Sequence, residues 1–426
     1  MSRSSSHLRL PRARLAAGVV VGFLLGATLT LAIQGSAGKD PRFGRPNGGR
    51  TPVASSGGAI PRTTPEPPAT FLAWVPGGMP SGFEGQASRL PHIDRAVVVG
   101  SDNTWLTKSF SAQGTLVDDP PKPYMVPLES AEVTPREYAP FLPPADRSVT
   151  ADLAAGRGIL GESSAKLRGL GVGSVLEFGY GRGAPVRVRI AAVLPDELVG
   201  ANELLVSRQM GGRIGIEQDR YALLQPSGHP SDAQLTNELR TVVSPGTPIQ
   251  VRAPGETPYF RQGDAVLPPV RIKKIFGEFD ARPKPGDPGY LEIDPRWVHE
   301  HIVTEKVPVL GRVTCNRVLM PQLHDAMEVV KRRGLSGAIH EFDGCYSPRF
   351  ILRNPEANIS HHSWGMAFDI NASTNPYGAQ PNQNPRLVRT IERYGFIWGG
   401  RFIVPDGNHF EYKSPPPPAS SGEVNA

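Results

Sequence analysis

The chain has 426 residues, of which 39% are hydrophobic and 20% charged, so it can bury a core of ordinary size, and its length predicts two or three domains. This composition excludes a fibrous or coiled-coil protein, and the two cysteines, Cys315 and Cys345, exclude a disulfide-rich scaffold and a cysteine-based zinc ribbon. The net charge of +6 is a mild excess without runs of basic and aromatic residues, so we expect no nucleic acid as a partner, whereas a polyanionic cell wall suits the charge.

The first feature along the chain is an uncharged, apolar segment of 19 residues, 15–33, preceded by four arginines. As a helix it is long enough to cross the hydrocarbon of a bilayer, which takes about 20 residues. Because the run is longer than the apolar core of a usual signal peptide, we favour an uncleaved signal anchor over residues 1–34. Cleavage near Gly35 or Ala37, which would release a secreted protein, stays open. Basic residues flank the segment equally on both sides, so its signal-like position alone places the rest of the chain outside the cytoplasmic membrane.

A stretch rich in Gly, Pro, Ser and Thr follows, which predicts a linker over residues 35–88. The next unit, residues 89–266, contains alternating runs such as 186–190, whose apolar residues share one face. Such alternation is typical of a half-buried strand, and we therefore expect a mixed α+β module. At the other end of the chain, a Pro-rich stretch predicts a disordered tail over residues 414–426.

One passage of the module, residues 160–178, combines helix and strand signals. Ser163 or Ser164 is expected to cap a short helix, and the glycines within 169–173 to end it before a strand. The passage resembles the extracellular core domain of MacB-type and FtsX-type permeases, in which such a helix leads through a glycine turn into a strand. The resemblance implies a binding or spacer module with a protein partner that the sequence does not identify. We find no catalytic constellation in this module.

The C-terminal unit, residues 267–413, is predicted to be a small antiparallel sheet with flanking helices, so the fold class of the chain is α+β. One helix is expected over 318–333, where apolar residues recur at helical spacing. A second is expected over 385–394, with Asn384 as its cap and proline at its first position. Four short aromatic-rich segments are predicted to be the strands: 367–370, 396–398, 402–404 and 409–412.

Two histidines and a carboxylate in this unit form a candidate metal site. His362 precedes Asp369 by seven positions, and His409 follows Asp369 by 40. Two imidazoles and one carboxylate are a zinc ligand set that leaves a fourth position open for water. On an unbroken strand the offset of seven would point His362 and Asp369 to opposite faces, and Gly365 is where the chain can bend to correct this.

The same residues fit two sequence patterns, S-x-H-x-x-G-x-A-x-D and D-x-x-H. The fixed positions are Ser360, His362, Gly365, Ala367 and Asp369 in the first pattern, and Asp406 and His409 in the second. In these patterns the C-terminal unit resembles the family of zinc D-alanyl-D-alanine carboxypeptidases of VanY type. That family includes phage endolysin L-alanyl-D-glutamate endopeptidases and the related hedgehog fold.

The resemblance implies a role for each of five residues. By similarity, His362, Asp369 and His409 are the zinc ligands. Asp406 resembles the general base that takes a proton from the attacking water and later protonates the leaving amine. Arg349 lies in a segment similar to one that carries a substrate-contacting arginine in the family, and is the candidate for stabilising negative charge.

Other interpretations of these residues stay open at this stage. His361 is adjacent to the expected ligand and is either exposed or supports the site, because the register of the pattern favours His362. Cys345 could act as a nucleophile, but it lacks the partner pattern of a cysteine peptidase, and we expect it to form a disulfide with Cys315. The zinc could also be structural, since retained ligands do not prove turnover.

The sequence therefore predicts a membrane-anchored zinc peptidase, with Zn²⁺ as its cofactor, that acts on peptidoglycan stem peptides outside the cytoplasmic membrane. A D-alanyl-D-alanine carboxypeptidase is the expected activity. An endopeptidase of the same mechanism is an alternative, because the loops that decide between the two carry no readable motif. A non-catalytic wall-binding or scaffold protein is a second alternative, because the large module before the metal motif has no chemistry of its own.

Overall fold

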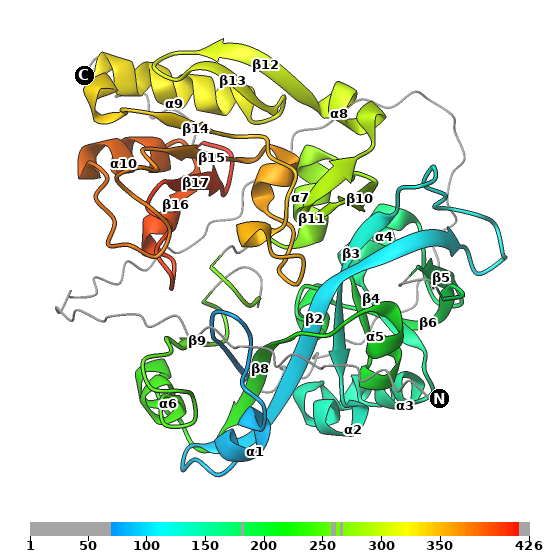
Figure 1. The fold of residues 1–426 in the computed structure, drawn as a ribbon. Coiled ribbons are helices and arrows are strands. Elements are labelled where there is room, and N and C mark those ends of the chain that lie inside the picture. Colours follow the sequence, from blue (N-terminus) through cyan, green and yellow to red (C-terminus); the bar gives the residue numbers. More distant parts are fainter. Residues whose placement is uncertain (1–69, 180–182, 257–260, 265–266, 417–426) are drawn as a thin grey trace, which may run out of the picture. The chain divides into compact units, whose positions relative to one another are not determined.

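The computed structural model describes residues 70–179, 183–256, 261–264 and 267–416, all of which fall in one unit, Pro65–Ala426. Figure 1 shows these residues as a ribbon coloured along the chain. Within them, no helix combines the length and the apolar character that a membrane span requires. The predicted signal anchor at 1–34 lies outside the described residues, as does most of the predicted tail.

A large mixed sheet forms the first part of the described chain. Its nine strands lie in the order β3-β7-β4-β6-β5-β2-β8-β1-β9, and its pairs are antiparallel except β3–β7 and β4–β6. The strands are β1 (Phe71–Trp74), β2 (Ile93–Phe110), β3 (Val126–Val133), β4 (Gly158–Gly161), β5 (Val175–Phe178), β6 (Val186–Leu194), β7 (Leu204–Ser207), β8 (Asp219–Pro226) and β9 (Gln250–Arg252). The long strand β2 pairs with β3, β5 and β8, and so connects the two halves of the sheet.

Short helices accompany this sheet, and three apolar clusters hold the layers together. The helices are α1 (Phe83–Ala87), α2 (Pro135–Tyr138), α3 (Val149–Ala154), α4 (Glu162–Arg168), α5 (Arg208–Ile214) and α6 (Asp232–Leu239). The alternating run 186–190 lies in β6 as expected, with Val188 and Ile190 buried and Arg187 and Arg189 exposed.

Helix α4 occupies the passage where a short helix is expected, but its predicted cap is wrong. The helix begins at Glu162, so Ser163 and Ser164 lie inside it, and Gly161 is the residue at its N-cap. Asp196 replaces a local cap, because its Oδ1 accepts a hydrogen bond from the Ser163 N–H at 3.0 Å. The C-terminal prediction holds, since Gly169 ends the helix in a left-handed conformation.

The predicted linker extends too far toward the C-terminus. Strand β1 and helix α1 lie inside the stretch 35–88, and β1 pairs with both β8 and β9. Leu72 and Ala73 of β1 are fully buried. The short apolar run of β1 is bounded by prolines and glycines, so its composition resembles a linker while its pairing makes it a central strand. Residues 35–69 lie outside the described part of the chain.

The second part of the described chain carries the metal motif on a four-stranded antiparallel sheet, in the order β14-β15-β17-β16. These strands are β14 (Phe342–Gly344), β15 (Ala367–Ile370), β16 (Phe396–Trp398) and β17 (His409–Tyr412). Two hairpins precede it: β10 (Ala281–Lys284) with β11 (Asp287–Ile293), and β12 (Ile302–Val307) with β13 (Gly311–Asn316). The helices are α7 (Pro269–Phe276), α8 (Pro295–His301), α9 (Met320–Arg332) and α10 (Pro385–Glu392). Helices α9 and α10 pack against each other beside the sheet (Figure 1).

Both long helices of this part and three of its four predicted strands are confirmed. Asn384 caps α10 as expected, because its Oδ1 accepts a hydrogen bond from the Arg386 N–H at 2.9 Å. The strand predicted over 402–404 is wrong, since this segment follows a short 3₁₀ helix, Gly399–Arg401, and pairs with no strand. Its Ile403 N–H instead donates to the side chain of Asp264 at 3.1 Å.

Candidate metal centre

The chain bends sharply between His362 and Asp369. His362 lies in a 3₁₀ helix, His361–Trp364, which ends at Gly365 with φ of +63°. A Cβ atom at Gly365 would lie 2.6 Å from the backbone nitrogen of Asn316, so this position combines a left-handed backbone with a close approach that only glycine tolerates. Asp369 then follows on β15.

His409 is brought to Asp369 by strand pairing. The two residues are direct partners in the antiparallel pair β15–β17, although 40 positions separate them in the sequence. Cross-strand partners on one face of a sheet have adjacent side chains. The bend at Gly365 and this pairing together bring three segments of the chain to one point.

The three predicted ligands offer donor atoms at metal-ligand spacing. His362 Nε2 lies 3.2 Å from Asp369 Oδ2 and 3.2 Å from His409 Nδ1, and His409 Nδ1 lies 3.0 Å from Asp369 Oδ1. Tetrahedral zinc with ligand bonds of about 2.0–2.1 Å places its ligand atoms about 3.3 Å apart. The described residues therefore contain a buried His–Asp–His group that is consistent with a zinc site.

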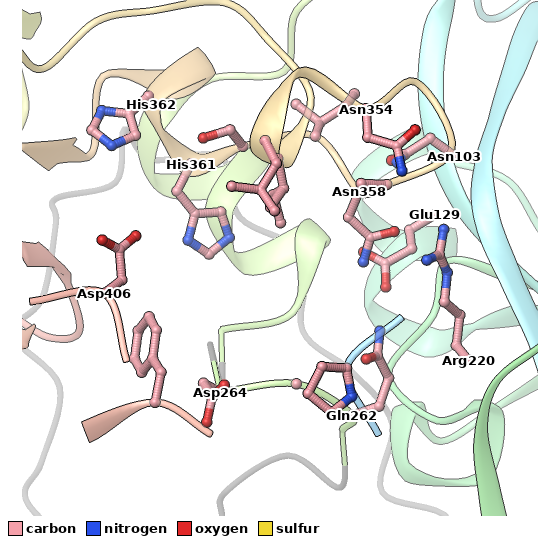
Figure 2. Close-up of a pocket in the computed structure, with 18 of the residues that line it drawn as sticks. Asn103, Glu129, Arg220, Gln262, Asp264, Asn354, Asn358, His361, His362 and Asp406 are labelled. Atoms are coloured by element: carbon pink, nitrogen blue, oxygen red, sulfur yellow. The ribbon is translucent and has the colours of Figure 1, made fainter. Parts of the chain in front are cut away.

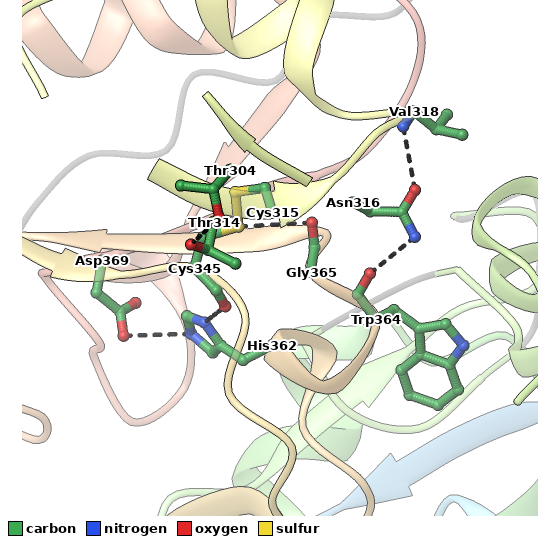
Figure 3. Close-up of a disulfide and its surroundings, with 10 residues drawn as sticks. All are labelled: Thr304, Thr314, Cys315, Asn316, Val318, Cys345, His362, Trp364, Gly365 and Asp369. Atoms are coloured by element: carbon green, nitrogen blue, oxygen red, sulfur yellow. Dashed lines mark hydrogen bonds and ion pairs between the residues drawn. A yellow bond between two sulfur atoms is a disulfide. The ribbon is translucent and has the colours of Figure 1, made fainter. Parts of the chain in front are cut away.

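The hydrogen bonds around this group leave the correct ring nitrogens free. Nδ1 of His362 is 2.7 Å from the backbone oxygen of Cys345, an acceptor only, so Nδ1 carries the proton and Nε2 a lone pair (Figure 3). Nε2 of His409 is 3.2 Å from Glu411 Oε2 and therefore donates, which leaves Nδ1 with a lone pair toward Asp369. Partners of this kind fix the tautomer and orientation of metal-ligating histidines.

The electrostatics of the group favour a bound cation. Burial by itself would raise the pKa of Asp369, but the imidazoles of His362 and His409 outweigh it and hold that pKa far below its usual range. Burial likewise opposes the charged form of His409, but the carboxylates of Asp369 and Glu411 raise its pKa to about 10. Without a metal the pair of carboxylates thus retains a proton on His409, and a metal ion would displace that proton.

Asp406 and Arg349 line the same cavity as the metal group, whose volume is about 770 Å³ (Figure 2). Asp406 is fixed by Asn408, whose Nδ2 donates to Asp406 Oδ1 at 2.9 Å, and burial raises the pKa of Asp406 above its usual value. The Arg349 guanidinium donates from Nη1 to the hydroxyl of Ser360 at 3.1 Å. The structure therefore brings all five predicted site residues to one cavity.

The predicted disulfide between Cys315 and Cys345 is confirmed, with Cα atoms 5.4 Å apart. It joins β13 to the segment that follows β14, and no free cysteine remains to act as a nucleophile in the described chain. Since the backbone oxygen of Cys345 accepts from His362, the crosslink holds a metal-site partner in place (Figure 3).

Sequence reasoning missed the role of Glu411. Its Oε2 lies 2.7 Å from His361 Nδ1 as well as 3.2 Å from His409 Nε2, and its side chain is 6% exposed. His361 therefore supports the site, one of the two alternatives that the sequence left open. The only signal was spacing: on strand β17, Glu411 is two residues after His409 and so shares its face.

Comparison with known proteins agrees with this geometry. Residues 353–412 match the family model for D-alanyl-D-alanine carboxypeptidase, which includes His362, Asp369, Asp406 and His409. No curated protein matches the chain. The match and the converging donor atoms together indicate a metallopeptidase domain.

The middle part of the chain resembles extracytoplasmic domains of transport proteins. The periplasmic region of MacB from Actinobacillus actinomycetemcomitans has 13% identity and a TM-score of 0.29, over 43% of this chain and 88% of that chain. The extracellular domain of the noncanonic ABC-type transporter YknZ from Gram-positive bacteria has 12% identity and a TM-score of 0.28, over 43% and 98%. A domain of a putative permease from Porphyromonas gingivalis has 15% identity and a TM-score of 0.28, over 49% and 95%.

Proposed function

We propose that the protein is a zinc-dependent D-alanyl-D-alanine carboxypeptidase that removes the terminal D-alanine from peptidoglycan stem peptides. The observation that carries this proposal is the convergence of His362, Asp369 and His409, with their outer ring nitrogens already bonded, inside the segment that matches the carboxypeptidase family. Hydrolysis is favoured over a structural role because the donor set leaves room for water and opens into a large cavity.

Each residue of the site has a chemical task in this proposal. A zinc ion held by the three ligands would acidify its water and polarise the scissile carbonyl. Asp406 would accept the proton of the attacking water and donate it to the leaving amine, a task for which a raised carboxyl pKa is suited. Arg349 would offset the negative charge that develops on the carbonyl oxygen.

The proposal includes the location and the division of the chain. We assign residues 1–34 to a single membrane span, 267–413 to the peptidase domain, and the sheet before it to a module outside the cytoplasmic membrane. The disulfide between Cys315 and Cys345 supports this location, because such bonds persist in oxidising compartments.

Mass spectrometry of pentapeptide muropeptides incubated with the zinc-loaded, full-length protein tests the proposal. The expected result is the loss of one alanine, which disappears in His362→Ala. His340→Ala, which changes an exposed histidine of the same domain, is the matched control and stays active. Cleavage within the stem or at a cross-link would replace the proposal with an endopeptidase. Tight binding of muropeptide without any change of mass would replace it with a wall-binding protein.

A further inference from the structure

The cavity of the metal group has walls from two parts of the chain (Figure 2). His362 and Asp406 lie on one side of it, in the C-terminal part. The opposite side is formed by the large sheet and the turn before β8, through Asn103, Gln218 and Arg220, which we call the far wall. The single cavity of about 770 Å³ is large enough to enclose a ligand of drug-like size, which exceeds a dipeptide.

A buried ion network attaches the large sheet to the peptidase part. Lys273 of α7 donates to Glu203 Oε1 at 2.7 Å and to the backbone oxygen of Pro127 at 2.7 Å, and the side chains of Lys273 and Glu203 are 2% and 0% exposed. Arg168 of α4 pairs with Glu278 on the other part. Breaking one partner of such a buried pair leaves an uncompensated charge, so the network resists separation of the two parts.

Main-chain hydrogen bonds add to this attachment. The Met125 N–H donates to Ala281 O at 2.9 Å, and the Ala281 N–H donates to Met125 O at 2.8 Å. These bonds join the start of β3 to β10. The far wall is therefore fixed with respect to the metal group.

Arg220 also fixes the loop 351–358, which lines the cavity between the far wall and His361. Its guanidinium donates to the backbone oxygen of Glu356 and, at 2.5 Å, to Asp102 Oδ1. The same loop contributes Asn358, whose buried Oδ1 has no hydrogen-bond partner among the described residues (Figure 2).

The polar character of the far wall indicates what it binds. Its charge is internally paired, because the Arg220 guanidinium is bonded to Asp102. Within the described chain, the side-chain amides of Asn103 and Gln218 make no hydrogen bond, so they are available to a ligand. Neutral amides both donate and accept, which matches the N–H and C=O groups of a peptide.

We propose that the far wall binds the stem peptide on the N-terminal side of the scissile bond, so that the large sheet takes part in substrate selection. This inference rests on the proposed carboxypeptidase function. A carboxypeptidase substrate ends one residue after the scissile bond, so only its N-terminal portion can occupy the rest of the cavity. The substrate class is therefore an extended stem peptide and not a free dipeptide.

The test compares a stem pentapeptide with N-acetyl-D-alanyl-D-alanine, using full-length, zinc-loaded protein. Asn103→Ala and Gln218→Ala are each expected to lower kcat/KM for the pentapeptide about three- to tenfold, the effect of one lost hydrogen bond. The short substrate, which does not reach the far wall, is expected to keep its kcat/KM. Gln113→Ala, an exposed amide of the same sheet outside the cavity, is the matched control.

Unchanged pentapeptide kinetics in both variants would overturn the inference. Equal losses on both substrates would also overturn it, because they indicate general damage to the site. Calorimetric binding of the pentapeptide to the same variants separates this inference from the proposed function. If the protein cleaves neither substrate, the proposed function fails, and weaker binding by the far-wall variants than by Gln113→Ala would still support the inference.

Discussion

Glu411 Oε2 lies 3.2 Å from Nε2 of His409, on the side of the ring opposite the nitrogen that faces Asp369. The same oxygen is 2.7 Å from His361 Nδ1. The carboxylate thus orients one metal-site histidine and is itself oriented by another. This arrangement ties the face of β17 to the 3₁₀ helix that carries His362.

Replacing Glu411 is expected to weaken zinc binding. In Glu411→Gln the neutral amide no longer requires a proton on His409 Nε2, so the Nδ1 lone pair is less firmly directed at the metal. Loss of such a partner typically costs about 10- to 100-fold in metal affinity. Competition with a chelator measures it. Glu392→Gln, which removes an exposed partner of Arg401, is the control, and equal zinc affinities of the two variants would contradict the prediction.

Replacing Asp406 is expected to reduce turnover without loss of metal. Asp406→Asn keeps the size of the side chain but removes its proton-accepting oxygen, and general acid–base catalysis contributes about 10²- to 10⁴-fold. Zinc content by atomic absorption and kcat on a pentapeptide are the two measurements. Asp325→Asn on the exposed face of α9 serves as control. An active Asp406→Asn would show that another group moves the proton.

The disulfide is expected to stabilise both the domain and the metal site. Cys315 and Cys345 are 30 positions apart, and closing a loop of this length contributes about 3–4 kcal/mol in the chain-entropy treatment. Reductant should therefore lower the melting temperature and the zinc affinity of the full-length protein, since the Cys345 oxygen holds His362. The double variant Cys315→Ala, Cys345→Ala should melt lower and respond no further to reductant. A melting temperature independent of reductant in the unaltered protein would contradict this.

Glu132 is expected to make the protein less stable as pH rises toward neutrality. Burial raises its pKa to about 7 from a model value of 4.5, although Arg208 Nη1 donates to Oε1 at 3.0 Å, and its Oε2 has no partner among the described residues. Between about pH 4.5 and 7 the folded state holds a proton that the unfolded state releases, so stability falls as pH rises through this window.

The variant Glu132→Gln removes this titration and should flatten the dependence of the melting temperature on pH between about 4.5 and 7. Glu177→Gln, which removes a carboxylate paired with Arg187 on the same sheet, should keep the original slope. The same slope in Glu132→Gln and in the unaltered protein would assign the pH dependence to other groups.

The sequence by itself determined those features whose signals are local. Helix α10 was predictable because Asn384 and Pro385 mark its start over neighbouring positions, and β15 and β17 because their aromatic residues alternate. The metal donors were predictable for a similar reason, since two short patterns contain them. The disulfide required only that the chain has two cysteines.

Only the tertiary structure decided the features that depend on distant partners. Strand β1 is buried because β8 and β9 flank it, and α4 starts where Asp196 can bond its first N–H groups. Glu411 acquires its role from His361, 50 positions away, through the bend at Gly365. The far wall belongs to the cavity because buried charges attach the large sheet to α7. Local composition encodes none of these contacts, since each becomes favourable only when folding removes both partners from water.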